Sequence, residues 1–221
     1  MPSFYGITIS IAILVCLTAA SKIFPHRKDI WDFGLYCIIG GILGARLYHI
    51  VDYWHFYLER PGYIFMVWHG GLGIWGAVIG GILGLYIYTS TYKKSFLETA
   101  DIAALVLPLG QAIGRWGNFF NSEISGSQTS LPWNLEGKHP IFLYESLLNL
   151  LLFFLLFRLS KKVVPAGYLL SSYLAGYGLI RFFLEYLRVN PWKIGALNVA
   201  QMLSILSIVI SVQIFNKKRL K

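Results

Sequence analysis

The chain has 221 residues, of which 56% are hydrophobic and only 13% charged, and its mean hydropathy is +0.60. Soluble domains carry about a quarter charged residues, so this composition excludes an ordinary soluble protein. The net charge of +9 does not indicate nucleic-acid binding, because the basic residues lie between apolar stretches.

Apolar runs of about 20 residues, long enough to cross a bilayer, follow one another along the chain. A segment in lipid must satisfy its own backbone hydrogen bonds, which helices do. We therefore predict an all-α integral membrane protein that forms one polytopic domain over residues 1–221. About seven transmembrane helices are expected, at residues 4–24, 30–51, 70–91, 100–120, 140–159, 166–187 and 197–215.

The basic residues predict the orientation of this bundle. Twelve of the 19 Lys and Arg residues fall on one side of it. Because cytoplasmic loops are enriched in these residues, the N-terminus is expected outside and the C-terminus in the cytoplasm. Several of the other seven, such as Arg46, Arg115 and Arg181, lie within or beside apolar segments, where a charge is expensive and needs a compensating role.

The second helix carries Arg46, His49 and Asp52 at spacings that place them on one flank. They could form a local charge relay, or Arg46 could reach the membrane interface along its apolar stem. Three pairs of glycines predict close contacts between helices. These pairs are Gly40-Gly41, Gly70-Gly71 and Gly80-Gly81.

The fourth helix ends in a polar segment that begins at Gly114 and runs into a loop. The planar fork of Arg115 is suited to bidentate phosphate binding. Three polar side chains could orient that fork or bind glycerol hydroxyls, namely those of Asn118, Asn121 and Glu123. The alternative is a capped helix terminus. Asp101, at the start of this helix, is interpreted as structural.

The fifth helix begins at His139-Pro140, and one turn further in a buried Glu145 is expected to pair with an arginine. The sixth helix carries a polar stripe on one face. Its members are Tyr177, Arg181, Glu185 and Arg188. An ion pair between Arg181 and Glu185 could serve helix packing alone, but two arginines beside one carboxylate leave a surplus cation.

No metal or cofactor site is predicted. The five histidines lack a ligand spacing, the two cysteines are isolated within apolar runs, and the sequence contains no nucleotide-binding loop.

The segment Gly114–Gly126 resembles the signature of the prolipoprotein diacylglyceryl transferase family, Gly-Arg-x-Gly/Ala-Asn-Phe-apolar-Asn-x-Glu-x-x-Gly, at every defined position. Further similarity covers nearly the whole chain. It includes Tyr5-Gly6, Gly44-Ala45-Arg46, Val67-Trp68-His69-Gly70-Gly71, His139-Pro140, Tyr144-Glu145, the Tyr177 to Arg188 stripe, and Gln201-x-x-Ser204.

This resemblance implies an enzyme of the bacterial cytoplasmic (inner) membrane. Such an enzyme transfers the diacylglyceryl group of phosphatidylglycerol to the lipobox cysteine of a prolipoprotein, releasing glycerol phosphate. In that reaction Arg115 would hold the lipid head group, and Arg181 would act on the reacting phosphate or the thiolate, while Glu185 and Glu123 fix their forks. Tyr177 completes the candidate catalytic set. Further substrate contacts are expected from Asn118, Asn121, Gly126, Tyr5, Arg46, His139 and Arg188.

The proton acceptor stays open among Tyr5, Tyr177, His139 and water. Many family members have His-Gly-Gly where this chain has Trp75-Gly76-Ala77, so an obligatory histidine base is not expected. Two other functions are compatible with a polar bundle: a transporter or channel with an arginine-lined anion path, and an inactive lipid-binding scaffold. The chain shows no inverted repeat typical of transporters, and its arginine sets are intact.

Overall fold

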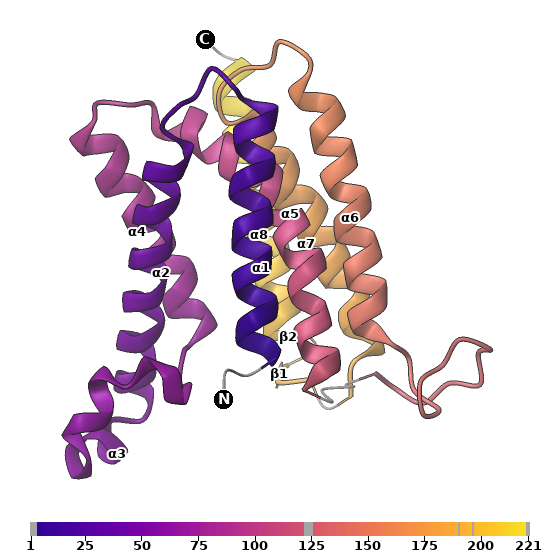
Figure 1. Ribbon diagram of the computed structural model, residues 1–221. Coiled ribbons are helices and arrows are strands. Elements are labelled where there is room, and N and C mark those ends of the chain that lie inside the picture. Colours follow the sequence, from indigo (N-terminus) through magenta and orange to yellow (C-terminus); the bar gives the residue numbers. More distant parts are fainter. Residues whose placement is uncertain (1–3, 122–125, 190, 196, 220–221) are drawn as a thin grey trace. The chain divides into compact units, whose positions relative to one another are not determined.

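The computed structural model describes residues 4–121, 126–189, 191–195 and 197–219 (Figure 1). The described residues form eight α-helices, three short 3-10 helices and one two-stranded sheet, which confirms the prediction of an all-α protein. They group into two compact units. We call residues 24–99 the smaller unit, and residues 1–23 together with 100–221 the larger unit.

The smaller unit is built on two long antiparallel helices joined by short helical turns. Its elements are α2 (Ile30–Asp52), α3 (Trp54–Glu59), η1 (Pro61–Phe65), η2 (Val67–His69) and α4 (Ile74–Thr91). Glycines let α2 and α4 approach closely, because a Cβ on Gly40 or Gly80 would overlap the carbonyl oxygen of the other residue. Gly44 and Gly76 meet in the same way one turn along. This is the packing expected of small residues between membrane helices.

The pair Gly70-Gly71 differs from the other two predicted pairs, because it lies outside the helices. Gly70 and Gly71 lie in the turn between η2 and α4, with φ of +86° and +72°, and α4 begins only at Ile74. Glycine adopts positive φ without steric cost, so this pair permits the turn, and Gly71 also packs closely on the side chains of Arg46 and His49 of α2. The aromatic-rich stretch from α3 to η2 also escaped prediction, since its helices are too short to produce an apolar run.

The larger unit contains five long helices and the short sheet. Its elements are α1 (Phe4–Ile23), most of α5 (Phe96–Phe120), α6 (Ile141–Ser160), α7 (Tyr168–Leu184), η3 (Glu185–Leu187), β1 (Lys193–Ile194), β2 (Leu197–Asn198) and α8 (Val199–Arg219). Pro140 immediately precedes α6 and does not occupy its first turn, a one-residue difference from the prediction.

Polar contacts fix α7 within the larger unit. The carboxylate of Asp101, on α5, accepts hydrogen bonds from the backbone N–H groups of Gly167 (2.7 Å) and Leu170 (2.8 Å), at the start of α7. Asp101 therefore caps a neighbouring helix, where a negative charge is favoured by the helix dipole. On α8, Ser211 donates to the carbonyl of Ser171 at 2.8 Å. At the base of α8, Asn198 and Gln201 form a capping box.

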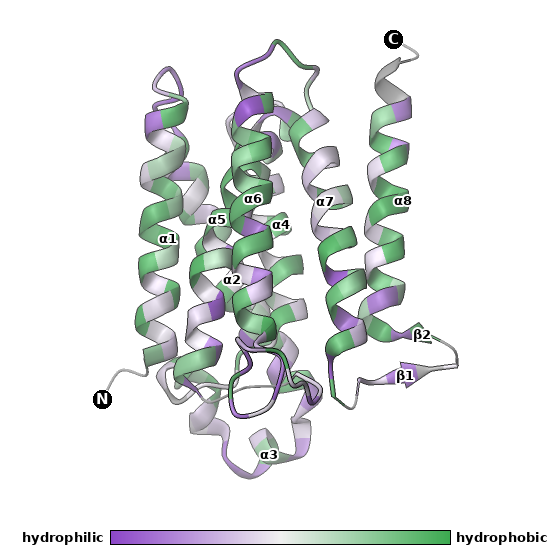
Figure 2. Ribbon diagram, turned by 90° about the vertical axis from the view of Figure 1, so that its right-hand side faces the viewer, coloured by the Kyte–Doolittle hydropathy of each residue, from purple (hydrophilic) through white to green (hydrophobic). Residues whose placement is uncertain are grey.

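The protein is a multi-pass membrane protein by the length and composition of its helices. Six of the described helices are long and apolar enough to cross a membrane: α1, α2, α4, α5, α6 and α8. The remaining long helix, α7, has 17 residues before η3 continues it. Figure 2 shows apolar residues along the length of α1, α6 and α8 and polar ones at loops and helix ends.

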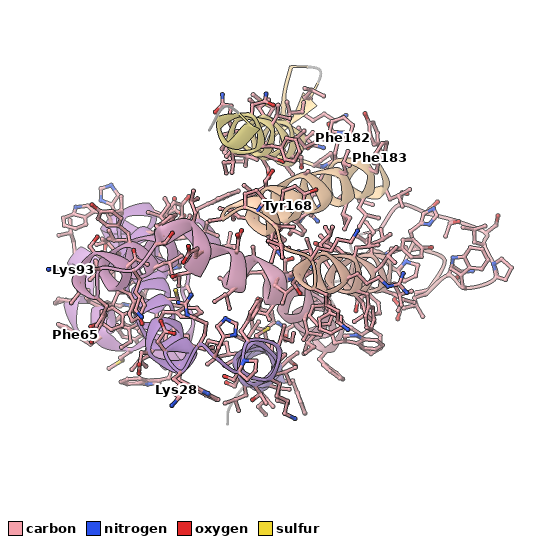
Figure 3. The ribbon with its side chains drawn as sticks, turned by 90° about the horizontal axis from the view of Figure 1, so that it is seen from above. Lys28, Phe65, Lys93, Tyr168, Phe182 and Phe183 are labelled. Atoms are coloured by element: carbon pink, nitrogen blue, oxygen red, sulfur yellow. The ribbon has the colours of Figure 1, made fainter. Side chains whose placement is uncertain are left out.

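Basic loops mark one end of the α2 and α4 pair. Lys28 precedes α2 and Lys93 follows α4, so the antiparallel packing of the two helices places both loops at the same end. Both side chains are exposed and extend from the edge of the smaller unit (Figure 3). In the larger unit, Tyr168 packs against Phe215 of α8 with ring centroids 5.6 Å apart.

Candidate active site

Glu145 is the centre of the polar cluster in the larger unit. It lies in the second turn of α6 with 1% of its side chain exposed, and it binds two arginines from different helices. Arg115 of α5 contacts one carboxylate oxygen at 2.7 Å, and Arg181 of α7 contacts the other at 2.9 Å. The hydroxyl of Tyr177 donates to Glu145 at 3.4 Å. Three helices are thus tied together by one buried carboxylate.

A second carboxylate extends the cluster at the end of α7. Arg181 uses its other terminal nitrogen to contact Glu185 at 2.9 Å, and Arg188 lies 3.5 Å from the second oxygen of Glu185. The predicted Arg181 to Glu185 ion pair is therefore present, but it is one link in a chain of five charged groups. The stripe stays on one face although α7 gives way to η3 at Glu185 and to extended backbone at Arg188.

The described cluster carries a surplus positive charge. Three arginines (115, 181 and 188) face two glutamates (145 and 185), which leaves +1 among these five side chains. The surplus is accessible, because 30% of the Arg115 side chain and 45% of the Arg188 side chain are exposed, against 17% for Arg181. A single-charged anion that approached these two arginines would complete the charge balance.

The end of α5 brings other predicted residues to the cluster. The side-chain oxygen of Asn118 lies 3.5 Å from Arg115, a contact at the limit of a hydrogen bond. The ring of Tyr5, on α1, packs against Gly117, where a Cβ would lie 2.8 Å from a ring carbon. The backbone of Asn121 donates to Gly117 at 3.1 Å and closes the helix. Glu123 lies outside the described residues.

The loop after α5 returns to the end of α7. Gly126 pairs with Arg188 in an antiparallel bridge and packs on the carbonyl of His139, whose position a Cβ on Gly126 would overlap. The ring nitrogen Nδ1 of His139 lies 3.3 Å from the hydroxyl of Tyr144, which also accepts a hydrogen bond from Trp133 at 2.8 Å. Gly126, His139 and Arg188 are therefore neighbours through the backbone of this loop.

The model of the prolipoprotein diacylglyceryl transferase family matches residues 3–216. The chain belongs to this family. Relatives named phosphatidylglycerol–prolipoprotein diacylglyceryl transferase include that of Synechococcus elongatus, 39% identical over 94% of this chain and 80% of the relative. The Listeria welshimeri relative is 38% identical over 98% of this chain and 86% of its own length. The Fervidobacterium nodosum relative is 40% identical over 93% of this chain and 77% of its own length.

The family resemblance also covers Arg46, which lies in the smaller unit and, among the described residues, gives its hydrogen bonds to backbone carbonyls. Its side chain is 7% exposed and its guanidinium stacks over the ring of Tyr57 at 5.3 Å. Among the described residues, the guanidinium donates to five backbone carbonyls, those of Tyr63, Ile64, Met66, Gly70 and Gly71. Arg46 thus fixes the path of η1, η2 and the turn before α4. Its role toward substrate stays a prediction.

Two other residues of the smaller unit complete the comparison with the sequence. His49 contacts the hydroxyl of Tyr57 at 2.9 Å and stacks on Tyr53, so it belongs to the aromatic packing of this segment. Trp75, which stands where many family members have a histidine, lies in the first turn of α4 and is 45% exposed. A half-exposed indole at that place offers packing surface and an N–H donor, and no proton acceptor.

Sequence reasoning expected Glu145 to pair with an arginine but left it out of the candidate site, although it binds two. The available signal was the spacing of Glu145 behind His139-Pro140, within the first turns of an apolar helix. A carboxylate at that depth needs compensation by more than one donor. Which arginines provide it depends on how α5, α6 and α7 pack, and the sequence alone does not determine that packing.

Proposed function

We propose that this chain transfers the diacylglyceryl group of phosphatidylglycerol to the lipobox cysteine of bacterial prolipoproteins. The thiol sulfur, as thiolate, attacks the glyceryl carbon that bears the phosphate. An S–C bond forms, the C–O bond breaks with its electron pair going to the phosphate oxygen, and glycerol phosphate leaves. The names of the relatives and the family match over residues 3–216 support this activity.

The observation that carries the proposal is the surplus of one positive charge among the five described side chains of the cluster. Phosphatidylglycerol bears a single negative charge on its phosphodiester, and the leaving phosphate gains a second during the reaction. Fixed guanidinium groups in a site of low dielectric stabilise that developing charge without reorganisation. Placing three guanidinium groups within the membrane-spanning region is costly unless anions there compensate their charge.

Within this cluster the two catalytic arginines have different surroundings. Arg115 has one carboxylate partner and an exposed face, which suits binding of the lipid head group. Arg181 is held between two carboxylates and is less exposed, which suits a fixed charge beside the reacting phosphate or the thiolate. We assign Glu185 to fixing Arg181, add Glu145 as the residue that positions both arginines, and assign substrate contacts to Asn118 and Arg188.

The remaining candidate site residues keep the roles that the family resemblance implies. Tyr5, Arg46, Asn121, Glu123, Gly126 and His139 are proposed to contact or position substrate. For the thiol proton, the acceptor is one of Tyr177, Tyr5, His139 or water. Tyr177 contacts the ion pairs directly, through its hydrogen bond to Glu145. A pH–rate profile of Tyr177→Phe would test it, since loss of the acceptor removes a limb of the profile.

We infer that the chain crosses the bacterial cytoplasmic membrane seven times, with its N-terminus outside, and works as one domain. Helix α7 has 17 residues and continues directly into η3, which has 3. The combined stretch of 20 residues is long enough to span a bilayer. The basic loops at Lys28 and Lys93 then face the cytoplasm, in agreement with the positive-inside rule. The active site lies toward the outer face, where prolipoproteins present their lipobox.

The activity is tested with purified protein in nanodiscs that contain labelled phosphatidylglycerol, with a lipobox peptide as acceptor. Wild-type protein should label the peptide, and Arg115→Ala should lose most of this activity. Arg158→Ala is the matched control, because Arg158 is an exposed arginine at the other end of α6. Absence of labelling by wild-type protein, together with anion flux in liposomes, would instead establish the transporter function.

A further inference from the structure

A second polar layer lies one helical turn inward of the ion pairs. Gln111 is four residues before Arg115 on α5, and Asn149 is four residues after Glu145 on α6. Tyr173 is four residues before Tyr177 on α7. One turn of helix advances about 5.4 Å, so the three polar side chains share a depth below the cluster. We call Gln111, Asn149 and Tyr173 the inner polar layer.

The three helices meet pairwise at this depth. Between α5 and α6, the hydroxyl of Ser146 donates to the carbonyl of Ala112 at 2.8 Å. Between α5 and α7, the side-chain nitrogen of Gln111 donates to the hydroxyl of Tyr173 at 2.8 Å. Between α6 and α7, Leu152 packs against Gly176, and Leu152 shares a helix face with Glu145 and Asn149. The inner polar layer is therefore enclosed by all three helices.

Within the described part of the chain, three buried atoms of this layer have no hydrogen-bond partner: the side-chain oxygen of Gln111 and both polar atoms of the Asn149 amide. Asn149 is fully buried, with 0% of its surface exposed. Nearly all buried polar atoms in native proteins are hydrogen-bonded, either to protein or to ordered water. An unsatisfied amide between apolar helices would be a large penalty with no compensation.

We propose that the inner polar layer is a hydration site, in which one or two buried waters bind Asn149 and Gln111. A water donates to two acceptors and accepts from donors, and the layer offers two carbonyl oxygens and one amide NH₂ group. Tyr173 accepts from Gln111 and keeps its own proton to donate to such a water. The ligand that we propose for this layer is therefore water.

This hydration site makes Asn149 a positioning residue for the reaction, a role that rests on the proposed transferase function. The rings of Tyr173 and Tyr177 stack with centroids 5.8 Å apart and an angle of 10° between their planes. Tyr177 in turn touches Glu145, which holds both catalytic arginines. A shift of the layer would therefore move the ion pairs, and small misplacements of catalytic groups are costly.

The test uses the full-length protein in phosphatidylglycerol nanodiscs and compares Asn149→Leu with Asn149→Ser. Leucine keeps the volume but cannot bind water, whereas serine keeps a donor and an acceptor. For Asn149→Leu we expect kcat to fall about 10- to 100-fold, with KM for the peptide nearly unchanged and the pH–rate profile displaced. Asn149→Ser should recover most of kcat. Asn216→Leu, the same exchange at an exposed position of α8, should change neither.

Thermal unfolding supplies a readout independent of activity. If water satisfies the amide, Asn149→Leu lowers Tm by about 3 °C or more. An equal or higher Tm, with unchanged kcat and pH profile, would overturn the proposal. If Asn149→Leu does not fold, a structure of the wild type that resolves ordered waters is the deciding measurement. Water density within hydrogen-bond distance of Asn149 and Gln111 would support the site. Direct packing without water density there would overturn it. If the wild type does not transfer the diacylglyceryl group, the proposed function is overturned, but the hydration site can still be tested by Tm and by the ordered waters.

Discussion

Two regions of this protein hold an arginine among apolar helices, and they satisfy its hydrogen-bond donors differently. Arg46, in the smaller unit, gives its hydrogen bonds to backbone carbonyls of one short segment. Arg181, in the larger unit, gives them to two carboxylates from two helices. Carbonyls are neutral acceptors that fix a chain path. Carboxylates carry charge and compensate the guanidinium groups around them, and here they leave one positive charge uncompensated among the described side chains of the cluster.

The difference distinguishes an arginine that determines shape from arginines that are poised for an anion. Around Arg46, the backbone of η1, η2 and the turn before α4 provides carbonyl acceptors for the guanidinium N–H groups. Around Arg181, among the residues that the structure describes, guanidinium groups outnumber carboxylates, and the two most exposed guanidinium groups are those of Arg115 and Arg188. Excess charge and exposure together, and not burial alone, indicate the reactive site.

Replacing Arg181 by alanine should give the largest loss of activity. We expect kcat/KM for transfer to fall by about 10³-fold or more, since a fixed charge beside the reacting phosphate is removed. Folding should persist, because Glu145 keeps Arg115 as a partner. The measurement is labelled-lipid transfer combined with Tm. Full activity in this variant would remove Arg181 from the mechanism.

Replacing Arg46 by alanine should act mainly on stability. Carbonyls of the η1 to α4 segment would lose their donor, which costs about 3 kcal/mol in free energy of unfolding. Denaturant titration in detergent measures this loss. Arg46→Lys, with a single compact charge, should recover only part of the stability because it cannot reproduce the planar fork. Wild-type stability in the alanine variant would contradict the role of Arg46 in holding this turn.

Arg188→Gln should have a smaller effect, confined to substrate capture. Its guanidinium is exposed and lies 3.5 Å from Glu185, so its removal should cost about 1 kcal/mol or less in stability. We expect kcat/KM to fall by about tenfold, together with a weaker dependence of the rate on salt, because a partly exposed charge steers the anionic lipid. An unchanged salt dependence would show that Arg188 does not face the lipid.

Trp75→Ala should change least. The indole is half-exposed and cannot accept a proton, so we expect a few-fold loss through packing or lipid positioning. The pH–rate profile should keep its shape. A profile that lost one limb, as when a general base is removed, would reverse this interpretation of the position at which many relatives carry a histidine.

Much of the fold could be predicted because lipid imposes simple rules on length and hydropathy. The predicted helix at residues 4–24 and the observed α1, Phe4–Ile23, differ by one residue. The stretch from α3 to η2 could not be predicted in this way, because it is held by Arg46 and aromatic contacts and not by its own apolar length. Contacts of that kind depend on residues far apart in the sequence.

The candidate site could be predicted in part, for a related reason. Family motifs and polar spacing indicated Arg115, Tyr177, Arg181, Glu185 and Arg188, and the structure places these five in one cluster. The double pairing of Glu145 and the inner polar layer arise where three helices meet. The sequence analysis did not identify the layer, because only packing shows that the spacings of four residues on the three helices coincide.

The cap that Asp101 places on α7 also bears on the opposite end of that helix. Asp101 holds Leu170 at the start of α7, and Arg181 lies eleven residues further along the same helix. At 1.5 Å per residue the two points are about 17 Å apart along a stiff rod. The carboxylate of Asp101, at one end of α7, therefore fixes the axial position of the Arg181 guanidinium near the other end of the same helix.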